Sequence, residues 1–509
     1  MGRRFLEIAD RVVSIGRWKY LLTACIAVYV WYFIRLSLDV HRGLGTSAYD
    51  LGLYDQGIWL LSRFEAPFVT LMGRNLLGDH ASLILLLVVP LYWLFPAVGT
   101  LLATQTVVIA LGAVPVFLVA RRRLGSDAMA FVFAGAYLLH PAVGWTNREN
   151  YHPDSFLGVL VGMALYGAIE RRWRVYAVFV VLALLVKEDV ALVVIPLGIW
   201  VAMRRDTRRG LATVVGALAA MLLGMFVLMR SLIGVPTRNA WRIPFGGPTG
   251  LVREVIERPG NVIDHFRSDD RPFYAWQMWF PVAFAFLRRP GIALVGAVVV
   301  GTNMLSTYWY QYQIEYHYSL IIVPTAVIGA VMGAAALPLR WKRRAVAAVA
   351  VTSVWSSLMW GAVPLGAVLN PGATDPIGRD LPYYWPADHP VAVAAREIMA
   401  AVPSDASVAA HHALTPHLSR RREIYQFPNP FRVVLYGPDT SLERARACLE
   451  AADTLEYVLL PSVVPPDLAP DWERVAGDFE VAASNQLWVL YHRRANTVTC
   501  EGGTLVSRP

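Results

Sequence analysis

Residues 47–63, SAYDLGLYDQGIWLLSR, combine two carboxylates with an apolar helical pattern. Asp50 and Asp55 follow the first hydrophobic stretch, and the apolar residues after Asp50 fall largely on one helical face, which is typical of a helix lying in the membrane interface. Such a helix holds a carboxylate at the bilayer surface, where it can accept a proton from a substrate. In the alternative interpretation, Asp50 only caps the N-terminus of this helix.

Two predicted outside loops supply further ionisable side chains. Residues 39–82 contain Arg74, Asp79 and His80. Residues 143–155 contain four more: Arg148, Glu149, His152 and Asp154. In the alternative interpretation, Asp79 and Asp154 cap the helices that follow them, and the histidines are ordinary polar residues of the interface. The functional interpretation rests on separate loops bringing these groups to one membrane face.

Lys187, Glu188 and Asp189 stand between two apolar runs that are each short for a membrane span. Because charges in lipid are costly, we expect this triplet at an outer apex or buried against protein. Lys187 then binds a phosphate as a point charge, with Glu188 or Asp189 holding it in place. The alternative is a solvated turn whose charges neutralise one another.

Two further outside segments are predicted at residues 231–273 and 307–316. The first is long, arginine-rich and interrupted by Pro and Gly, and its length favours an ordered binding loop. The second begins TYWYQYQIEYH, in which anchoring at the membrane boundary accounts for Tyr308, Trp309 and Tyr310. The remaining mixture also suits a sugar, which stacks on aromatic rings and hydrogen-bonds to polar groups. The candidates there are Tyr312, Glu315 and His317.

Composition indicates a polytopic membrane protein. Of 509 residues, 56% are hydrophobic and 16% charged, and the mean hydropathy is +0.45, which is far more apolar than a soluble protein. The net charge of +9 comes with arginine clusters between apolar runs, as the positive-inside rule describes, and does not indicate nucleic acid. We therefore expect a multi-pass membrane protein with an uncleaved first span and a cytoplasmic N-terminus.

The predicted membrane spans follow from runs of apolar residues between these clusters. They lie at about residues 21–38, 98–120, 126–142, 156–169, 175–187, 189–203, 210–229, 274–287, 291–306, 317–338 and 345–365. A further run at residues 83–95 is short and ends at Pro96. Only an odd number of crossings fits between the first outside loop and the cluster at Arg121, so we expect this run to be re-entrant or interfacial.

From about residue 370 the chain becomes polar and Pro-rich. Strand-like runs at 407–410, 423–425, 457–460 and 487–491 alternate with helical patterns at 391–401 and 441–452. We expect a small extracytoplasmic α/β domain over residues 370–509, after a membrane domain over residues 1–366. Cys448 and Cys500 are candidates for a disulfide in an oxidising compartment. Walker, GxGxxG and GxSxG motifs are absent, so nucleotide hydrolysis is not indicated.

Several segments together resemble a known family. In chain order they are TSAYDLGLYDQGIW, NLLGDHASLILLLVVPLYWLF, ARRRLG, ENYHPDSF, LLVKEDVAL and EYHYSLIIVP, followed by SVAAHHALTPHLSRRREIYQFP. They resemble a bacterial family of polytopic membrane proteins of the domain-of-unknown-function 2079 type, which is placed with the GT-C glycosyltransferases. The resemblance implies a protein of the bacterial plasma membrane with a GT-C-like α-helical fold of about 11–12 membrane segments. It also implies that a sugar is transferred from a polyprenyl phosphate with inversion of the anomeric centre. In such enzymes an acidic residue in the first outside loop is essential as general base or metal ligand. The matching position is Asp50, with Asp55 as the alternative.

The implied donor has an apolar tail that stays in the bilayer and an anionic head at its surface. Asp50 would take a proton from the acceptor hydroxyl, and Lys187, with Arg148 or Arg74, would stabilise the departing phosphate. A divalent Mg or Mn ion is a further option, with oxygen and imidazole ligands. The candidate ligands are Asp50, His80, His152 and Asp154. The expected partners are the lipid-linked sugar donor, membrane lipids and an acceptor that is a glycan, lipid or protein of the cell envelope.

Two non-enzymatic interpretations compete with this one. A transporter of lipid-linked glycans should show inverted repeats, and none stands out in the sequence. An envelope-assembly scaffold would bind partners through the C-terminal domain and would not need Asp50.

Overall fold

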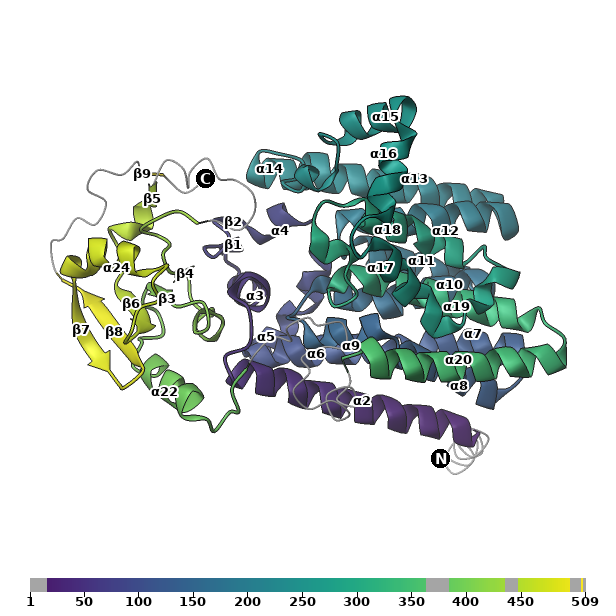
Figure 1. The fold of residues 1–509 in the computed structure, drawn as a ribbon, viewed down its shortest axis with the longest axis horizontal. Coiled ribbons are helices and arrows are strands. Elements are labelled where there is room, and N and C mark those ends of the chain that lie inside the picture. The colour runs from purple at the N-terminus through teal and green to yellow at the C-terminus, as the bar shows by residue number, and fades with distance from the viewer. Residues whose placement is uncertain (1–15, 363–383, 435–446, 495–504, 507–509) are drawn as a thin grey trace, which may run out of the picture.

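A computed structural model of the protein describes residues 16–362, 384–434, 447–494 and 505–506 (Figure 1). A bundle of helices extends to residue 362, and a smaller part built on a β-sheet begins at residue 384. The expected boundary between the two domains, at residues 366–370, lies outside the described residues.

The long helices of the bundle lie side by side along the longest dimension of the molecule (Figure 1). They are α2 (Arg17–Arg42), α6 (Val98–Leu111), α7 (Ala113–Leu124), α8 (Asp127–Leu138), α10 (Leu157–Ile169), α11 (Trp173–Leu184), α12 (Ala191–Arg204), α13 (Thr207–Leu223), α18 (Ala293–Leu305), α19 (Val323–Ala335) and α20 (Leu339–Trp360). α10 and α19 bury nearly all of their residues, whereas α13 leaves most of its apolar side chains exposed. Because so much exposed apolar surface marks contact with a membrane or partner, the outer helices are suited to lipid.

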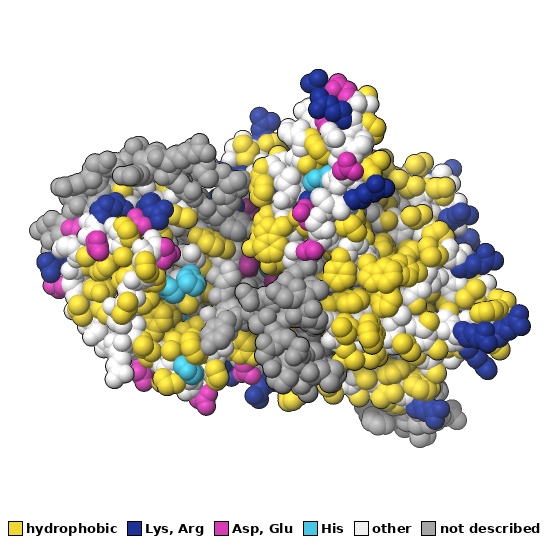
Figure 2. Space-filling view, viewed as in Figure 1, with side chains coloured by type: hydrophobic (Ala, Val, Ile, Leu, Met, Phe, Trp, Pro, Cys, Tyr) yellow, Lys and Arg dark blue, Asp and Glu magenta, His cyan; other side chains and the backbone are white. Residues whose placement is uncertain are grey.

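The surface of the bundle has the pattern of a membrane protein. Hydrophobic side chains cover much of the face in Figure 2, and Lys and Arg side chains gather at the end farthest from the sheet. Arg205, after α12, lies close enough to interact electrostatically with Arg123, in the last turn of α7, and with Arg171, after α10. The arginine clusters of the sequence thus meet in space, as expected for loops on one membrane face.

Four described helical stretches are long and apolar enough to cross a membrane. They are Arg17–Arg42, Val98–Leu124, Thr207–Ile233 and His317–Ala335. A fifth results if α8 and α9 (Pro141–Arg148), which meet at a 45° bend, form one broken span. Other expected spans are apolar helices of 10–17 residues, so the number of 11–12 segments stays a prediction.

The expected span at residues 274–287 is not a continuous helix. α17 (Arg271–Trp279) is followed by two 3-10 turns, η7 (Phe280–Val282) and η8 (Ala285–Arg288), and Ala283 and Phe284 between them have positive φ. Pro281 lacks the N–H that would continue the helix, so the chain turns here.

The short apolar run at residues 83–95 forms η2 (Leu83–Leu87) and α5 (Val89–Leu94). At 1.5 Å per residue this segment reaches about 18 Å, which is short of the roughly 30 Å of a bilayer core. The N–H of Ile84 donates to the C=O of Leu185 at 2.8 Å, so the segment begins against the turn after α11.

The C-terminal part is a small α/β domain with a five-stranded sheet in the order β4-β3-β6-β8-β7. The strands are β3 (Val408–Ala410), β4 (Ile424–Gln426), β6 (Tyr457–Pro461), β7 (Phe479–Ser484) and β8 (Trp488–Arg493). β3 pairs in parallel with β4 and β6, and β8 pairs antiparallel with β6 and β7. The four expected strands correspond to β3, β4, β6 and β8.

The helices of this domain agree less well with the sequence analysis. The helix expected at 391–401 is α22 (Pro390–Met399), whereas α24 (Ala469–Val475) was not expected. The helix expected at 441–452 falls partly outside the described residues; its described end forms β5 (Cys448–Leu449), which pairs with β9 (Leu505–Val506), and the 3-10 turn η12 (Glu450–Ala452). Cys448 is buried, and Cys500 lies outside the described residues.

The two parts join at α3 (Leu53–Ser62), and Figure 1 shows this helix against the sheet domain. The side-chain amide of Gln56 donates to the backbone carbonyls of Arg421 and Arg422 at 3.2 and 3.1 Å. The Thr70 hydroxyl donates to the carbonyl of Ile424 at 2.6 Å, and one hydrophobic core extends across the junction. The segment from α3 to Thr70 therefore connects the bundle with the sheet domain.

Candidate functional site

A cavity of about 250 Å³ lies among the connections between the helices. It brings together residues from six separate stretches of the chain, and its lining combines charged groups with tyrosines. The lining residues are Ser47, Tyr49, Asp50, Leu53, Tyr54, Asp79, His80, Glu149, His152, Lys187, Asn239, Arg242, Tyr308, Tyr310, Tyr316, His317 and Tyr318.

Asp50 lies in a short π-helical turn, η1 (Ala48–Gly52), directly before α3. Ser47 caps this turn, because its hydroxyl accepts from the N–H of Tyr49 at 3.2 Å. The alternative in which Asp50 is the cap is therefore wrong. The Asp50 carboxylate is partly exposed in the cavity, with Oδ1 3.4 Å from Nε2 of His152.

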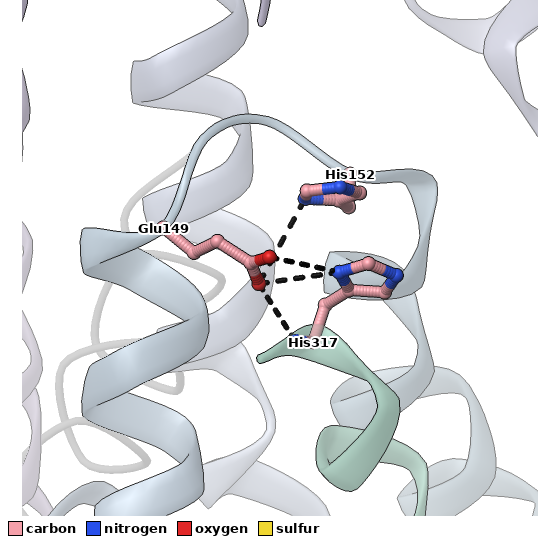
Figure 3. Close-up of side chains that lie close together, drawn as sticks. All are labelled: Glu149, His152 and His317. Atoms are coloured by element: carbon pink, nitrogen blue, oxygen red, sulfur yellow. Dashed lines mark hydrogen bonds and ion pairs between the residues drawn. The ribbon is translucent and has the colours of Figure 1, made fainter. Parts of the chain in front are cut away.

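Glu149, His152 and His317 form a compact cluster beside Asp50 (Figure 3). Glu149 accepts from the backbone N–H of His317 at 2.6 Å and faces Nδ1 of the same residue at 3.2 Å. The two imidazole rings stack with their centres 3.7 Å apart. Nδ1 of His152 donates to the carbonyl of Asn150 at 2.9 Å, which leaves Nε2 directed at Asp50.

The cluster holds a proton near neutral pH. Burial, and to a lesser extent the charge of Asp50, together raise the pKa of Glu149 to about 8 against the opposing effect of His152. Burial alone would lower the pKa of His152, but the charges of Glu149 and Asp50 raise it above its ordinary value. Since Nδ1 of His152 already donates to Asn150, a second ring proton lets Nε2 donate to Asp50. His152 thus orients the Asp50 carboxylate.

Lys187 is buried beside Asp154 and is not part of a solvated turn. It precedes the 3-10 turn η4 (Glu188–Val190), is 3% exposed, and places Nζ 2.5 Å from Oδ2 of Asp154. Burial disfavours the ammonium, but nearby carboxylates, Asp154 first, raise its pKa overall, so Lys187 is charged. Asp154, in η3 (Pro153–Phe156), therefore holds Lys187 in place, a role expected of Glu188 or Asp189, and is not the helix cap of the alternative interpretation.

Glu188 and Arg74 form ion pairs with His80 and Asp79, two residues that line the cavity. Glu188 pairs with Nδ1 of His80 at 2.8 Å and accepts from the N–H of Ala81 at 3.1 Å. Arg74, in β2 (Arg74–Asn75), pairs with Asp79 at the end of α4 (Leu76–Asp79), with 2.7 Å between the charged atoms. Because Glu188 accepts from Ala81, Asp79 does not cap that position, and both acids take part in ion pairs instead.

Arg242 and several tyrosines line the cavity but were not among the sequence candidates. Arg242 ends the short turn η6 (Ala240–Arg242), donates to the Tyr318 hydroxyl at 3.5 Å, and lies 4.3 Å from the ring centre of Tyr308. The segments that contain them, residues 231–273 and 307–316, were expected to be binding loops, but Tyr308 and Tyr310 were assigned to membrane anchoring. The sequence signal that could have identified these tyrosines is the number of aromatic residues between Tyr308 and Tyr318.

Asp55 does not line the cavity, although it is five residues from Asp50. It is fully buried at the junction with the sheet domain, where it accepts from the Tyr92 hydroxyl at 2.6 Å and the Ser419 hydroxyl at 2.5 Å. Five helical residues correspond to a rotation of about 140°, so the two carboxylates face different sides. Burial raises the pKa of Asp55.

Seven other candidates also lie outside the lining, as a correction to the sequence analysis: Arg74, Asp154 and Glu188, described above, and Arg148, Asp189, Tyr312 and Glu315. The Arg148 guanidinium lies over Trp145, 5.5 Å from its ring centre, and Tyr312 is buried beneath Arg271 at 4.0 Å. Half-buried Glu315 and exposed Asp189 do not line the cavity either. Arg242 therefore lines the cavity, whereas Arg148 and Arg74, the arginines expected to bind phosphate, do not.

The four expected metal ligands do not converge on one point. His80 pairs with Glu188 and Asp154 with Lys187, which leaves only Asp50 and His152 in contact. Donor atoms of Glu149, His152 and His317 do lie within 4.8 Å of one another. In this arrangement Nδ1 of His152 faces the Asn150 carbonyl, and Glu149 accepts the N–H of His317.

Comparison with known proteins identifies the fold. The model of the family described as predicted membrane protein (DUF2079) matches residues 40–474. No curated protein matches significantly. The crystal structure of ArnT from Cupriavidus metallidurans bound to undecaprenyl phosphate is similar, with a TM-score of 0.55 and 15% identity over 95% of this chain and 99% of that one. The apo state of the same ArnT gives a TM-score of 0.54 and 16% identity over 94% and 98%. The expected GT-C-like fold with a C-terminal sheet domain is thereby confirmed.

Proposed function

The chain belongs to the DUF2079 family of predicted membrane proteins, and we propose that it is a membrane glycosyltransferase that moves a sugar from a polyprenyl phosphate donor to a cell-envelope acceptor. The observation that carries this proposal is the cavity in which Asp50 lies together with Lys187 and Arg242. The similarity to ArnT, solved with undecaprenyl phosphate, extends over nearly the whole of both chains and supports a lipid-linked donor.

Asp50 is the general base in this proposal. Its carboxylate is open to the cavity and oriented by His152 at 3.4 Å. Removal of the acceptor's hydroxyl proton allows that oxygen to attack the anomeric carbon as the bond to the donor phosphate breaks, which inverts the centre. The Glu149–His317 pair fixes the imidazole that orients Asp50, and so acts through His152.

Arg242 and Lys187 stabilise the departing phosphate. A guanidinium presents a planar fork that matches two phosphate oxygens, and Arg242 lies at the cavity wall between Tyr308 and Tyr318. Lys187 supplies a fixed positive charge, because Asp154 holds its ammonium in one position. Preorganised charges of this kind lower the barrier without reorganising during the reaction.

The tyrosines provide a surface for the sugar. Tyr310 packs edge to face on Tyr316, with ring centres 4.3 Å apart, and both line the cavity beside Asp50. Aromatic faces bind the C–H side of a sugar ring, while hydroxyl groups hydrogen-bond to its edge. We place this site at the outer membrane face, because the Lys and Arg side chains gather at the opposite end of the bundle (Figure 2).

The substitution Asp50→Asn tests the proposal. Asp55→Asn is its matched control, because Asp55 lies five residues further along the chain and does not line the cavity. Purified variants would be assayed with a panel of radiolabelled polyprenyl-phosphate sugars, and folding followed by the thermal unfolding midpoint. We expect Asp50→Asn to lose transfer by about 100-fold or more with an unchanged midpoint. Asp55→Asn should lower the midpoint, because it disturbs buried hydrogen bonds, and keep transfer per folded molecule.

Two results would reject the proposal. Full transfer by Asp50→Asn would remove its role as base. No turnover of any such donor by the unaltered protein would favour an envelope-assembly scaffold or a transporter of lipid-linked glycans.

A further inference from the structure

A second cavity, of about 610 Å³, lies at the junction of the helical bundle and the sheet domain. Four arginines line it, Arg63 at the end of α3 and Arg420–Arg422 before β4, together with a single carboxylate, Asp405. It shares no lining residue with the Asp50 cavity. The function proposed above therefore leaves this concentration of positive charge unexplained.

Arg421 places a permanent positive charge in the wall of this junction cavity. Its side chain is 5% exposed and donates to the backbone carbonyls of Leu418, Pro403 and Ala406 at distances between 2.7 and 3.1 Å. Burial lowers the pKa of Arg421 only to about 10, so the group remains cationic at neutral pH. Within the described part of the chain, no carboxylate forms an ion pair with it.

Arg63 and Arg420 line the junction cavity from the two parts of the molecule, the helical bundle and the sheet domain. The exposed Arg63 guanidinium lies over Trp59, 4.4 Å from the ring centre, and forms no ion pair with a described residue. Arg420 donates to the carbonyl of Pro96 and has Nε 3.9 Å from Asp55, at the limit of an ion pair. Arg422 differs, because Glu65 neutralises it through two hydrogen bonds. The cavity thus has positive charge in excess of its carboxylates.

The residues next to this cavity are unusually apolar and exposed. Phe64 follows Arg63 in the chain and is 86% exposed, while Trp93, Leu94 and Phe95, which precede Pro96, are all more than half exposed. Phe64 and Trp93 contact each other, with ring centres 5.9 Å apart, and the indole N–H of Trp93 donates to the carbonyl of Ser62. Exposed aromatic residues with neighbouring arginines are typical of the interface between acyl chains and head groups.

From this combination we infer that the junction cavity binds the phosphate of an anionic phospholipid. The phosphate lies between Arg63 of the bundle and Arg420 of the sheet domain, above the fixed charge of Arg421, and the acyl chains lie along Phe64, Trp93, Leu94 and Phe95. The lipid bridges the two parts of the molecule and strengthens their docking. A free phosphate would use the arginines but would leave the apolar rim without a partner.

Lipid retention by the full-length protein tests this inference. Protein in a neutral detergent would be incubated with phosphatidylglycerol, phosphatidylcholine or inorganic phosphate at equal concentration, and examined by native mass spectrometry and thermal unfolding. We expect phosphatidylglycerol alone to remain bound and to raise the unfolding midpoint. Arg63→Ala and Arg420→Ala should each weaken its binding by about tenfold, because each removes a charged hydrogen bond to phosphate.

Arg267→Ala, which removes an exposed arginine of another segment, serves as the control and should bind phosphatidylglycerol as the unaltered protein does. Equal binding of both lipids, or equal weakening in Arg267→Ala, would overturn the inference. An equal shift with inorganic phosphate would replace the lipid with a free anion, which also overturns it. Because no readout involves sugar transfer, failure here leaves the proposed glycosyltransferase activity unaffected.

Discussion

The Asp50 cavity and the junction cavity differ in how their charged side chains are paired. Around the Asp50 cavity, cations have carboxylate partners at short range, as in the pairs Lys187 with Asp154 at 2.5 Å and His80 with Glu188 at 2.8 Å. In the junction cavity, Arg421 is satisfied by backbone carbonyls. The first site is a network whose geometry is set by internal ion pairs, whereas the second retains positive charge for an external anion.

This difference indicates how each site uses its charges. A buried ion pair contributes little net stability compared with apolar residues, but it fixes the position of each partner. Such positioning is what a catalytic cavity requires. Exposed arginines that lack a carboxylate keep their side chains adaptable and their charge available, which suits binding of a lipid head group.

The largest expected effect concerns the buried pair of Lys187 and Asp154. Lys187→Met leaves the Asp154 carboxylate buried without its cation, and we expect this to cost about 3–5 kcal/mol of unfolding free energy. Chemical or thermal unfolding in detergent would measure the loss. Arg63→Ala, in the junction cavity and without added lipid, should cost less than about 1 kcal/mol, because that side chain is exposed. Equal losses in the two variants would contradict the contrast between the cavities.

A double substitution sharpens this prediction. Lys187→Met combined with Asp154→Leu removes both charges, so it should recover much of the stability lost in Lys187→Met. Additive losses would instead show that the two side chains act independently.

The next effect is a pH dependence caused by Glu149. Burial raises its pKa to about 8 in the folded protein, so between its ordinary value and pH 8 the folded state binds a proton that the unfolded state lacks. Stability should therefore fall as the pH rises through this range, by up to about 1.4 kcal/mol per pH unit. Glu149→Gln should flatten the decline in the unfolding midpoint between pH 5 and 8. In the unaltered protein His152, whose pKa is also raised, adds a dependence of the same sign above pH 6.5, and Glu149→Gln should reduce this contribution too, because the charge of Glu149 is the main cause that raises the pKa of His152. An unchanged slope in Glu149→Gln would show that the carboxyl does not hold the proton.

The smallest effect is expected at the exposed pair of Arg422 and Glu65. Both side chains face solvent, and exposed ion pairs often contribute nothing measurable. Glu65→Gln should leave the unfolding midpoint unchanged without lipid. The same substitution removes the neutralising partner of Arg422, so it should tighten binding of phosphatidylglycerol. A lower midpoint without lipid would mean that the pair supports the junction itself.

Much of the fold could be predicted because its signals are local. Apolar runs and arginine clusters indicated the membrane part, and short runs of strand-forming residues indicated four of the five strands of the sheet. β7 was missed, and most of its residues are exposed, so its sequence lacks a strong apolar alternation. The span expected at residues 274–287 failed because Pro281 interrupts a helix that hydropathy alone cannot distinguish from a continuous one.

In the candidate site, too, the sequence predicted some features and only the tertiary structure decided others. The sequence by itself determined that Asp50, His152, Lys187 and His317 belong to polar segments that a membrane protein must keep out of lipid, because charge in hydrocarbon is costly. It could not determine their partners. Asp50 and Asp55 have the same chemistry and the same neighbourhood in the chain, yet only the rotation of the helix opens one to the cavity and buries the other against Ser419. Likewise, only tertiary packing paired Lys187 with Asp154 rather than with its adjacent acids, since contacts between distant segments depend on how the helices pack and not on local sequence.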